Sequence, residues 1–201
     1  MTNKIKKRYN RIASFYDILD KPMEMALSRW RKDLLSEVKG EVLEVGIGTG
    51  KNIPWYPDTI DLTGIDFSPK MVEITREKYG DRPNVKILEM DAQKMDFSDN
   101  SFDTVVTSCV FCSVPKPVQG LLEIQRVCKN GGKIVMLEHV RSHKKMVGPI
   151  MDALNFIPLH LYGANINRET YHNLLKAGFS PSQIDVENVW LDIVKRIRIN
   201  N

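Results

Sequence analysis

Acidic side chains and glycines stand where apolar runs of the sequence end, and together they could hold a small polar ligand. The run EVLEV at residues 41–45 contains Glu44 and leads into GIGTG, with three glycines at alternate positions. Two later apolar runs end near Asp66 and Asp91. Carboxylates accept hydrogen bonds from hydroxyl and amino groups, and glycines let a ligand come close to the backbone. The pattern therefore predicts a site for a ligand that carries hydroxyl and amino groups.

The spacing of Gly46, Gly48 and Gly50 differs from that of a dinucleotide site. The pattern Gly-x-Gly-x-x-Gly marks an NAD-binding turn, but here Lys51 occupies the third glycine position. The sequence also contains no Gly-x-x-x-x-Gly-Lys-Ser/Thr phosphate loop. Glu44 beside the turn would repel a pyrophosphate and attract a cationic amino group. A nucleoside with a cationic tail in place of phosphates fits these features, and S-adenosylmethionine is such a molecule.

Alternating strands and helices are expected to position these residues. Two helices come first, at 3–19 and 23–38, and are followed by a change of pattern at residue 41. Strands are predicted at 41–46, 61–66, 84–92, 102–109 and 133–140, helices at 68–80, 116–132, 144–156 and 167–178, and two final strands within 183–198. This alternation predicts an α/β fold with a doubly wound, mostly parallel seven-stranded sheet and helices on both faces.

The carboxyl ends of the predicted strands place the acidic residues together, because ligands of such sheets bind beyond those ends. Asp66 ends the second strand, twenty residues after Gly46, where an acid binds a ribose diol. Asp91 ends the third strand and is expected to be free to meet the exocyclic amine of an adenine. The strand ends therefore provide for an adenine, a ribose and a closely packed chain.

Four ordered segments resemble the motifs of class I S-adenosylmethionine-dependent methyltransferases over roughly residues 41–140. They are VLEVGIGTG, TGIDFSPKMVEITREK, EMDAQKMDFSDNSFDTVVTS and RVCKNGGKIVMLEHV. The resemblance implies a Rossmann-like methyltransferase fold, S-adenosylmethionine as cofactor, S-adenosylhomocysteine as product, and no metal. It assigns the cofactor contacts to Glu44, Gly46, Gly48, Gly50, Asp66, Phe67, Asp91, Ala92 and Ser108.

Other segments resemble a narrower group of methyltransferases. RYNRIASFYD at 8–17 is similar to the opening of the ubiquinone/menaquinone C-methyltransferases and of bacterial phospholipid N-methyltransferases. GTGKNIPWYP, FCSVPKP and LYGANINRETYHNLLKAGF resemble phospholipid methyltransferases and alkyl-thiol methyltransferase-like proteins. The resemblance implies methyl transfer to a small-molecule or lipid acceptor, first of all a phospholipid amine such as phosphatidylethanolamine. Alkyl-thiol S-methylation and quinone C-methylation are the alternatives.

The candidate catalytic residues are His139, Glu138 and Tyr16. Glu138 and His139 follow the fifth strand, and His139 is a candidate base for deprotonating the acceptor; a structural or wall role for it is the alternative. Tyr9 and Tyr16 are expected to close over the cofactor or to line the acceptor pocket, with packing of the first helix as the alternative. We accordingly expect an N-terminal lid at 1–40 and a catalytic domain at 41–201, which together form a single domain.

Charge is unevenly distributed along the chain, whose net charge is +4. Residues 1–40 carry ten Lys/Arg and five Asp/Glu, and the segment 144–166 is apolar. Together these features predict an apolar acceptor and peripheral contact with an anionic membrane at the inner surface; a solvated basic helix face is the alternative. No run of 18 apolar residues and no signal-peptide h-region occurs, which makes a cytoplasmic location the expectation.

Other functions find less support in the sequence. Adenine N6-methyltransferases carry Asn/Asp-Pro-Pro-aromatic after the fourth strand, where this chain has SCVF at 108–111, so no nucleic-acid partner is expected. Cys109 and Cys112 form a lone C-x-x-C at a strand end, which predicts pocket lining and not a zinc or redox site. The four histidines show no metal-ligand spacing. A cofactor-binding protein without enzymatic activity is the remaining alternative.

Overall fold

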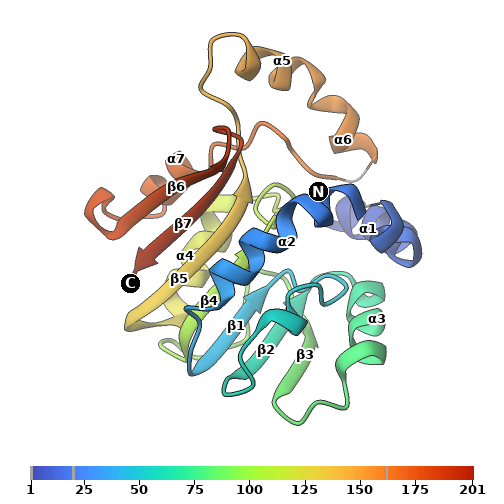
Figure 1. Ribbon diagram of the computed structural model, residues 1–201, viewed down its shortest axis with the longest axis vertical. Coiled ribbons are helices and arrows are strands. Elements are labelled where there is room, and N and C mark those ends of the chain that lie inside the picture. The colour runs from blue at the N-terminus through green and yellow to red at the C-terminus, as the bar shows by residue number, and fades with distance from the viewer. Residues whose placement is uncertain (1, 20, 162) are drawn as a thin grey trace.

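The computed structural model describes residues 2–19, 21–161 and 163–201, and its centre is a seven-stranded sheet with helices on both faces (Figure 1). The strands are β1 (Glu41–Val45), β2 (Asp61–Asp66), β3 (Val85–Glu89), β4 (Phe102–Ser108), β5 (Cys128–His139), β6 (Ile184–Trp190) and β7 (Val194–Asn200). Their order is β3-β2-β1-β4-β5-β7-β6. Pairs from β3 to β5 are parallel, and β7 is antiparallel to both neighbours. The predicted mostly parallel, doubly wound sheet is confirmed.

Apolar side chains alternate between the two faces of the sheet along each strand, and they form one buried layer on each face. Val42 belongs to a cluster with Leu34 of α2, whereas Leu43 belongs to a cluster with Leu121 of α4 and Leu174 of α7. The helices are α1 (Thr2–Leu19), α2 (Lys21–Leu35), α3 (Pro69–Tyr79), α4 (Pro117–Val127), α5 (Val147–Leu154), α6 (Phe156–Leu161) and α7 (Thr170–Lys176). Each fully buried Leu or Val contributes about 1.5–3 kcal/mol. Because successive side chains of a strand point to opposite faces of the sheet, a single strand packs against helices on both faces.

Several helix boundaries differ from the prediction. The helix expected at 23–38 spans Lys21–Leu35, and the helix expected at 167–178 spans Thr170–Lys176. The helix expected at 116–132 ends at Val127, and Cys128–His139 form β5. The Gly131 and Gly132 backbone is paired with the chain end: Gly131 N–H donates to Asn201 O at 2.8 Å, and Asn201 N–H donates to Gly132 O at 3.0 Å. This pairing with a residue 70 positions later is a tertiary contact that the local sequence does not reveal. The helix expected at 144–156 begins only at Val147, and α6 follows after Asn155.

Helix α1 lies between α3 and α6, over the carboxyl ends of β1 and β2 (Figure 1). Ser68 Oγ at the start of α3 donates to Asn10 Oδ1 at 2.6 Å. Asp17 accepts from Thr49 Oγ1 at 2.6 Å and from Lys78 Nζ at 2.7 Å. These bonds fasten α1 to the glycine turn and to α3, as a lid over that edge would require. The division into a lid at 1–40 and a catalytic domain at 41–201 remains a prediction.

No helix within the described part of the chain has the length and apolarity needed to cross a membrane.

Candidate active site

The glycine turn after β1 adopts a backbone that L-residues rarely take. Gly46, Gly48 and Gly50 have φ values of +73°, +56° and +80°. A Cβ on Gly46 would lie 2.5 Å from Val110 Cγ2, and one on Gly50 would lie 2.8 Å from Tyr79 Cε2. A Cβ on Gly48 would meet nothing within 4 Å. Two of the glycines are therefore required by packing, while the third leaves open space above the turn.

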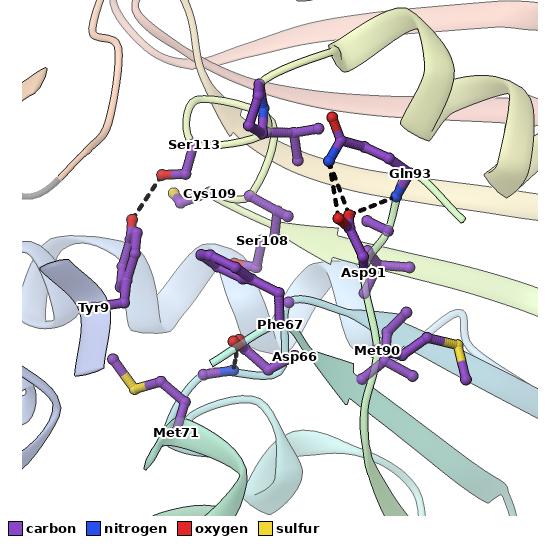
Figure 2. A pocket seen from close by; sticks show the side chains of 18 of the residues that line it. Tyr9, Asp66, Phe67, Met71, Met90, Asp91, Gln93, Ser108, Cys109 and Ser113 are labelled. Atoms are coloured by element: carbon purple, nitrogen blue, oxygen red, sulfur yellow. Dashed lines mark hydrogen bonds between the residues drawn. The ribbon is translucent and has the colours of Figure 1, made fainter. Parts of the chain in front are cut away.

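Asp66 closes this turn against the start of α3. Its carboxylate is buried and accepts from Gly48 N–H at 3.0 Å (Figure 2). It also accepts from Ser68 N–H at 2.8 Å. Burial raises the pKa of Asp66 to about 6, while the two backbone donors lower it. Each carboxylate oxygen has a second lone pair, so Asp66 can still accept from a ligand hydroxyl. The structure thus brings the predicted acid to the predicted glycine turn.

The cofactor cavity, as we call the space above Asp66, holds about 720 Å³ of empty space. Its lining includes most of the predicted cofactor residues: Gly46, Gly48, Asp66, Phe67, Asp91, Ala92 and Ser108. Ile65, Met71, Met90 and Val114 add an apolar wall that the sequence analysis did not name. The cavity lies at the switch point between β1 and β4, where the strand order reverses.

Asp91 lines the cofactor cavity, and its carboxylate is partly occupied by Gln93, which the sequence analysis did not foresee. Both of its carboxylate oxygens accept from Gln93 Nε2, at 2.9 and 3.1 Å, and Oδ1 also accepts from Gln93 N–H at 2.9 Å (Figure 2). Gln93 Oε1 in turn accepts from Lys116 N–H at 2.9 Å. Gln93 therefore orients Asp91 at the cavity wall. The prediction missed Gln93 because its partner at the start of α4 is distant in sequence.

A second cavity, which we call the tail cavity, adjoins the first and is charged. It holds about 450 Å³ of empty space, and both cavities are lined by Tyr16, Gly46, Gly48, Ser108 and Cys109. Glu44 and Arg31 line only the tail cavity. This compartment accounts for the carboxylate that the sequence places beside the glycine turn.

A hydrogen-bonded chain links the charged groups of the tail cavity. Arg31 Nη1 donates to Asn52 Oδ1 at 2.6 Å and to Ser108 Oγ at 2.8 Å. Asn52 Nδ2 donates to Glu44 Oε1 at 2.7 Å, and Tyr56 OH donates to Glu44 Oε2 at 3.0 Å. Burial raises the pKa of Glu44 to about 7. A carboxylate and a guanidinium thus stand in one compartment, oriented by neutral partners.

Sequence reasoning missed Arg31, although a signal for it exists. Leu27, Leu34 and Leu35 form the buried face of α2, and Arg31 lies on the same face at helical spacing and is itself buried. A charged residue on an apolar helix face requires a partner, because burying an unpaired charge is costly. That spacing could have predicted a polar compartment beneath α2.

Tyr9 and Tyr16 of α1 both reach the cofactor cavity. Tyr9 OH lies 2.6 Å from Ser113 Oγ, and its ring packs edge-on against Phe67 with 5.7 Å between centroids (Figure 2). Burial raises the pKa of Tyr9 far above its ordinary value, so the phenol is neutral at physiological pH. The Tyr16 ring lies beneath Lys51 Nζ, 4.8 Å from the centroid. The lid residues are thus at the cavity, whatever their chemical role.

Glu138 and His139 are not among the residues that line the cofactor or tail cavity. Glu138 is fully buried and accepts from Thr107 Oγ1 at 2.8 Å, Val110 N–H at 3.3 Å and Phe111 N–H at 3.2 Å. Burial raises its pKa to about 7. This geometry supports an anchoring role for Glu138, which holds the loop that follows β4. Burial lowers the pKa of His139. A catalytic role for these residues remains a prediction that the geometry does not support.

The two cysteines of the C-x-x-C pair have different surroundings. Cys109, at a φ of +55°, lines both cavities, whereas Cys112 is buried and donates its thiol to Cys109 O at 3.1 Å. Among the described residues, Cys109, Cys112 and Cys128 form no disulfide. Within the described residues, no group of three or more His, Cys, Asp or Glu side chains could hold a metal ion.

The fold and the site define a class of protein. A family model described as a methyltransferase domain matches residues 43–136, the segment from β1 to β5 that forms the cavity floor. The structure is similar over 98% of this chain and 99% of the other to an S-adenosylmethionine-dependent methyltransferase, possibly a histamine N-methyltransferase, from Thermotoga maritima, with a TM-score of 0.73 at 20% identity. The chain therefore contains a methyltransferase domain over residues 43–136 and has the fold seen in the S-adenosylmethionine-dependent methyltransferases.

Two curated relatives show which kinds of methyltransferase this chain resembles in sequence. The chain is 41% identical over 118 residues to a phosphatidylethanolamine N-methyltransferase of Cereibacter sphaeroides, covering 57% of this chain and 58% of that protein. It is 33% identical over 149 residues to the ubiquinone/menaquinone biosynthesis C-methyltransferase UbiE of Geotalea daltonii (strain DSM 22248 / JCM 15807 / FRC-32), covering 67% and 63%. These matches span less than two thirds of either relative's length. The relatives support the class and leave the acceptor to be argued from the site.

Proposed function

We propose that the protein transfers a methyl group from S-adenosylmethionine to the amine of a phospholipid such as phosphatidylethanolamine. The observation that carries the cofactor half of this proposal is the pair of joined cavities. One is largely apolar and has Asp66 at its edge, and the other contains Glu44 and Arg31. A nucleoside with a zwitterionic amino-acid tail has the same division of polarity.

The residues present fit this cofactor group by group. Asp66 would accept from the ribose hydroxyls, and Asp91 would accept from the adenine amine against the apolar wall. Glu44 would bind the amino group of the tail, and Arg31 its carboxylate, since a guanidinium matches carboxylate geometry. Gly48 fits because its missing side chain leaves the space through which the chain would pass.

The protein's own contribution to catalysis would be orientation and the exclusion of water. S-adenosylmethionine, when bound, supplies an electrophilic methyl group on a positively charged sulfur. That charge is lost during transfer, so a dry, well-positioned site is more useful than a strong acid. Tyr9 and Tyr16 on α1 would cover the site. Positioning of this kind lowers a barrier by up to about 7–11 kcal/mol.

A phospholipid is favoured as acceptor for two reasons. The relative named as a phosphatidylethanolamine N-methyltransferase has the higher identity of the two described above. The helices α5 and α6 also expose large apolar side chains: Met146 just before α5, then Ile150, Leu154, Phe156, Ile157 and Leu161. Such a ridge, projecting from the sheet beside α1 (Figure 1), suits contact with a lipid surface. Quinone C-methylation, named for the second relative, and thiol S-methylation are the alternatives.

We further propose peripheral binding to anionic membranes through this apolar ridge. Lys144 and Lys145 precede α5 and are exposed, and Lys4 and Arg8 of α1 line a cavity together with Leu159 and His160 of α6. Each basic residue near an anionic surface adds about 1 kcal/mol, within a Debye length. Cosedimentation with vesicles of phosphatidylglycerol but not of phosphatidylcholine, lost in about 0.5 M salt, is the expected result. Equal binding to both vesicle types would contradict the electrostatic part.

A transfer assay with methyl-labelled S-adenosylmethionine tests the function directly. The acceptors are phosphatidylethanolamine in neutral detergent micelles, a demethylated quinone and a small alkyl thiol. Calorimetry with S-adenosylhomocysteine tests cofactor binding separately, with Asp66→Asn as the site variant and the exposed Asp96→Asn as a control of equal charge change. Label in the lipid fraction supports the proposal. Label only in the quinone or the thiol would move the proposal to that acceptor.

A further inference from the structure

A third cavity adjoins the cofactor cavity, and Ser113 and Pro115 line both. We call it the acceptor cavity. It holds about 820 Å³ of empty space between α1, the loop after β4, α6 and the segment before α7. Its wall is mostly apolar, with Ile5, Leu159 and Pro115 among the residues. A molecule here would have direct access to the cofactor cavity past Ser113.

Three cationic side chains face this apolar space: Lys4, Arg8 and Arg168. Arg8 donates to Leu159 O, and Arg168 Nη2 donates to Cys112 O at 3.2 Å and to Val114 O at 3.1 Å. Their hydrogen-bond partners are thus neutral carbonyl groups.

No carboxylate pairs directly with these side chains. Among the described residues, no carboxylate forms an ion pair with any of the three. Burial lowers the pKa of Arg168, because its charge loses solvation, and the buried Glu138 offsets this only in part from beyond ion-pair distance. Grouped cations without a directly paired counter-charge favour the binding of an anion.

We infer that the acceptor cavity binds a phosphate ester of the methyl acceptor through Lys4, Arg8 and Arg168. This inference rests on the proposed function and specifies the substrate of that same site. In an ethanolamine phosphate the amine is separated from the ester oxygen by two carbons. A phosphate held in the acceptor cavity therefore leaves the amine to reach the cofactor cavity beside Ser113. The apolar wall then suits the remainder of a lipid.

The charge distribution discriminates among the candidate acceptors. An alkyl thiol or a quinone has no anionic group close to the carbon or sulfur that receives the methyl group. Such acceptors would leave the three cations unbalanced in a largely apolar cavity, at a cost in binding. A phosphate diester and a phosphate monoester both satisfy them, so the lipid and its free head group must be separated by experiment.

The variant that tests the inference is Arg8→Gln, which keeps a donor for Leu159 O and removes the charge. Arg8→Lys restores the charge, and Lys4→Gln is a second variant at an exposed position. The control is Arg11→Gln, because Arg11 is on the same helix, is exposed and does not line the cavity. All variants are measured in full-length protein, with neutral detergent micelles as the lipid carrier.

The expected result is a rise in the KM for phosphatidylethanolamine of about tenfold to a hundredfold in Arg8→Gln, from the loss of a charge-assisted hydrogen bond. Arg8→Lys should recover most of it, Lys4→Gln should show a smaller rise, and Arg11→Gln should show none. Calorimetry with glycerophosphoethanolamine, on protein saturated with S-adenosylhomocysteine, should show the same order of affinities. Unchanged KM and unchanged affinity in Arg8→Gln and Lys4→Gln would overturn the inference.

Further measurements distinguish a lipid phosphate from a soluble phosphate ester. They also distinguish a failure of this inference from a failure of the proposed function. Phosphoethanolamine as a better acceptor than phosphatidylethanolamine would assign the cavity to a soluble monoester, and the reverse order would assign it to a lipid. Free ethanolamine should be a poor acceptor, and equal use of it would contradict phosphate recognition. A protein that binds no S-adenosylhomocysteine fails the proposed function, whereas one that binds it and ignores phosphate fails only this inference.

Discussion

Replacing Gly48 by alanine separates the folding role of the glycine turn from its binding role. The residue has a φ of +56°, and a Cβ there would meet no protein atom within 4 Å. The alanine side chain therefore clashes with no protein atom, and stability is lowered only by the backbone conformation, which costs an L-residue about 1–2 kcal/mol. The new methyl group instead enters the space proposed for the cofactor. Gly48→Ala should consequently fold and bind S-adenosylhomocysteine poorly.

The matched control is Gly131→Ala. Gly131 has a φ of +77°, its Cβ would also meet nothing within 4 Å, and it lies in β5 outside the lining of the cofactor and tail cavities. Both variants should lose similar stability, with a fall in Tm of about 2–4 °C for each kcal/mol in a domain of this size. Only Gly48→Ala should lose affinity. An inserted methyl group costs about 1–3 kcal/mol in a packed site, or about fivefold to a hundredfold in Kd.

Two assays on each purified variant decide the outcome: thermal unfolding and calorimetric titration with S-adenosylhomocysteine. Equal losses of stability together with unchanged affinity in Gly48→Ala would refute the reasoning, because the ligand could not then pass over the turn. A similar loss of affinity in Gly131→Ala would also refute it, since destabilisation alone would then explain the result.

Three further outcomes are expected. Because burial raises the pKa of Asp66 to about 6 and that of Glu44 to about 7, both carboxylates are protonated in turn as the pH falls, and calorimetric affinity for S-adenosylhomocysteine should begin to fall near pH 7 and should fall by at least about tenfold for each unit below pH 6; a flat profile from pH 5 to 8 would contradict this. Glu138→Gln places an amide among three donors and should lower the free energy of unfolding by about 1–3 kcal/mol in a urea titration, unlike the exposed Glu187→Gln. The double variant Ile150→Asp/Leu154→Asp should stay folded, because both side chains are about half exposed, yet lose cosedimentation with anionic vesicles; full binding would remove the apolar ridge from the membrane contact.

The division of charge between the cavities is consistent with the proposal that an unphosphorylated nucleoside binds beside a phosphate-bearing acceptor. Glu44 and Asp66 lie at the glycine turn, where they disfavour a phosphate, and Lys4 and Arg8 lie in the acceptor cavity. Opposite charge preferences in adjoining cavities would orient the two proposed reactants before they meet. Such orientation is the contribution that a methyl transfer needs most from a protein.

The sequence by itself determined the elements that local patterns control. Alternating apolar residues predicted the strands, and Ser68, followed by Pro69 and ended by Gly80, predicted α3, whose N-cap bond from Met71 N–H to Ser68 Oγ is present at 3.3 Å. The glycine turn and Asp66 were also predictable, because each lies at the carboxyl end of a short, regular strand. Each of these features depends on residues that are close together in the sequence.

Tertiary structure alone decided which groups share a cavity. Arg31 lies 77 positions before Ser108, to which it donates, and Arg8 lies 151 positions before Leu159. The sequence predicted Glu138 on the reacting side because it lies near the end of β5, yet its carboxylate accepts hydrogen bonds from Thr107 of β4 and from the loop after β4. The sequence pattern shows where a strand ends, but it does not show which groups form hydrogen bonds with the side chains at that end. Those groups belong to segments that are distant in sequence and meet only when the chain packs, so local sequence patterns do not reveal them.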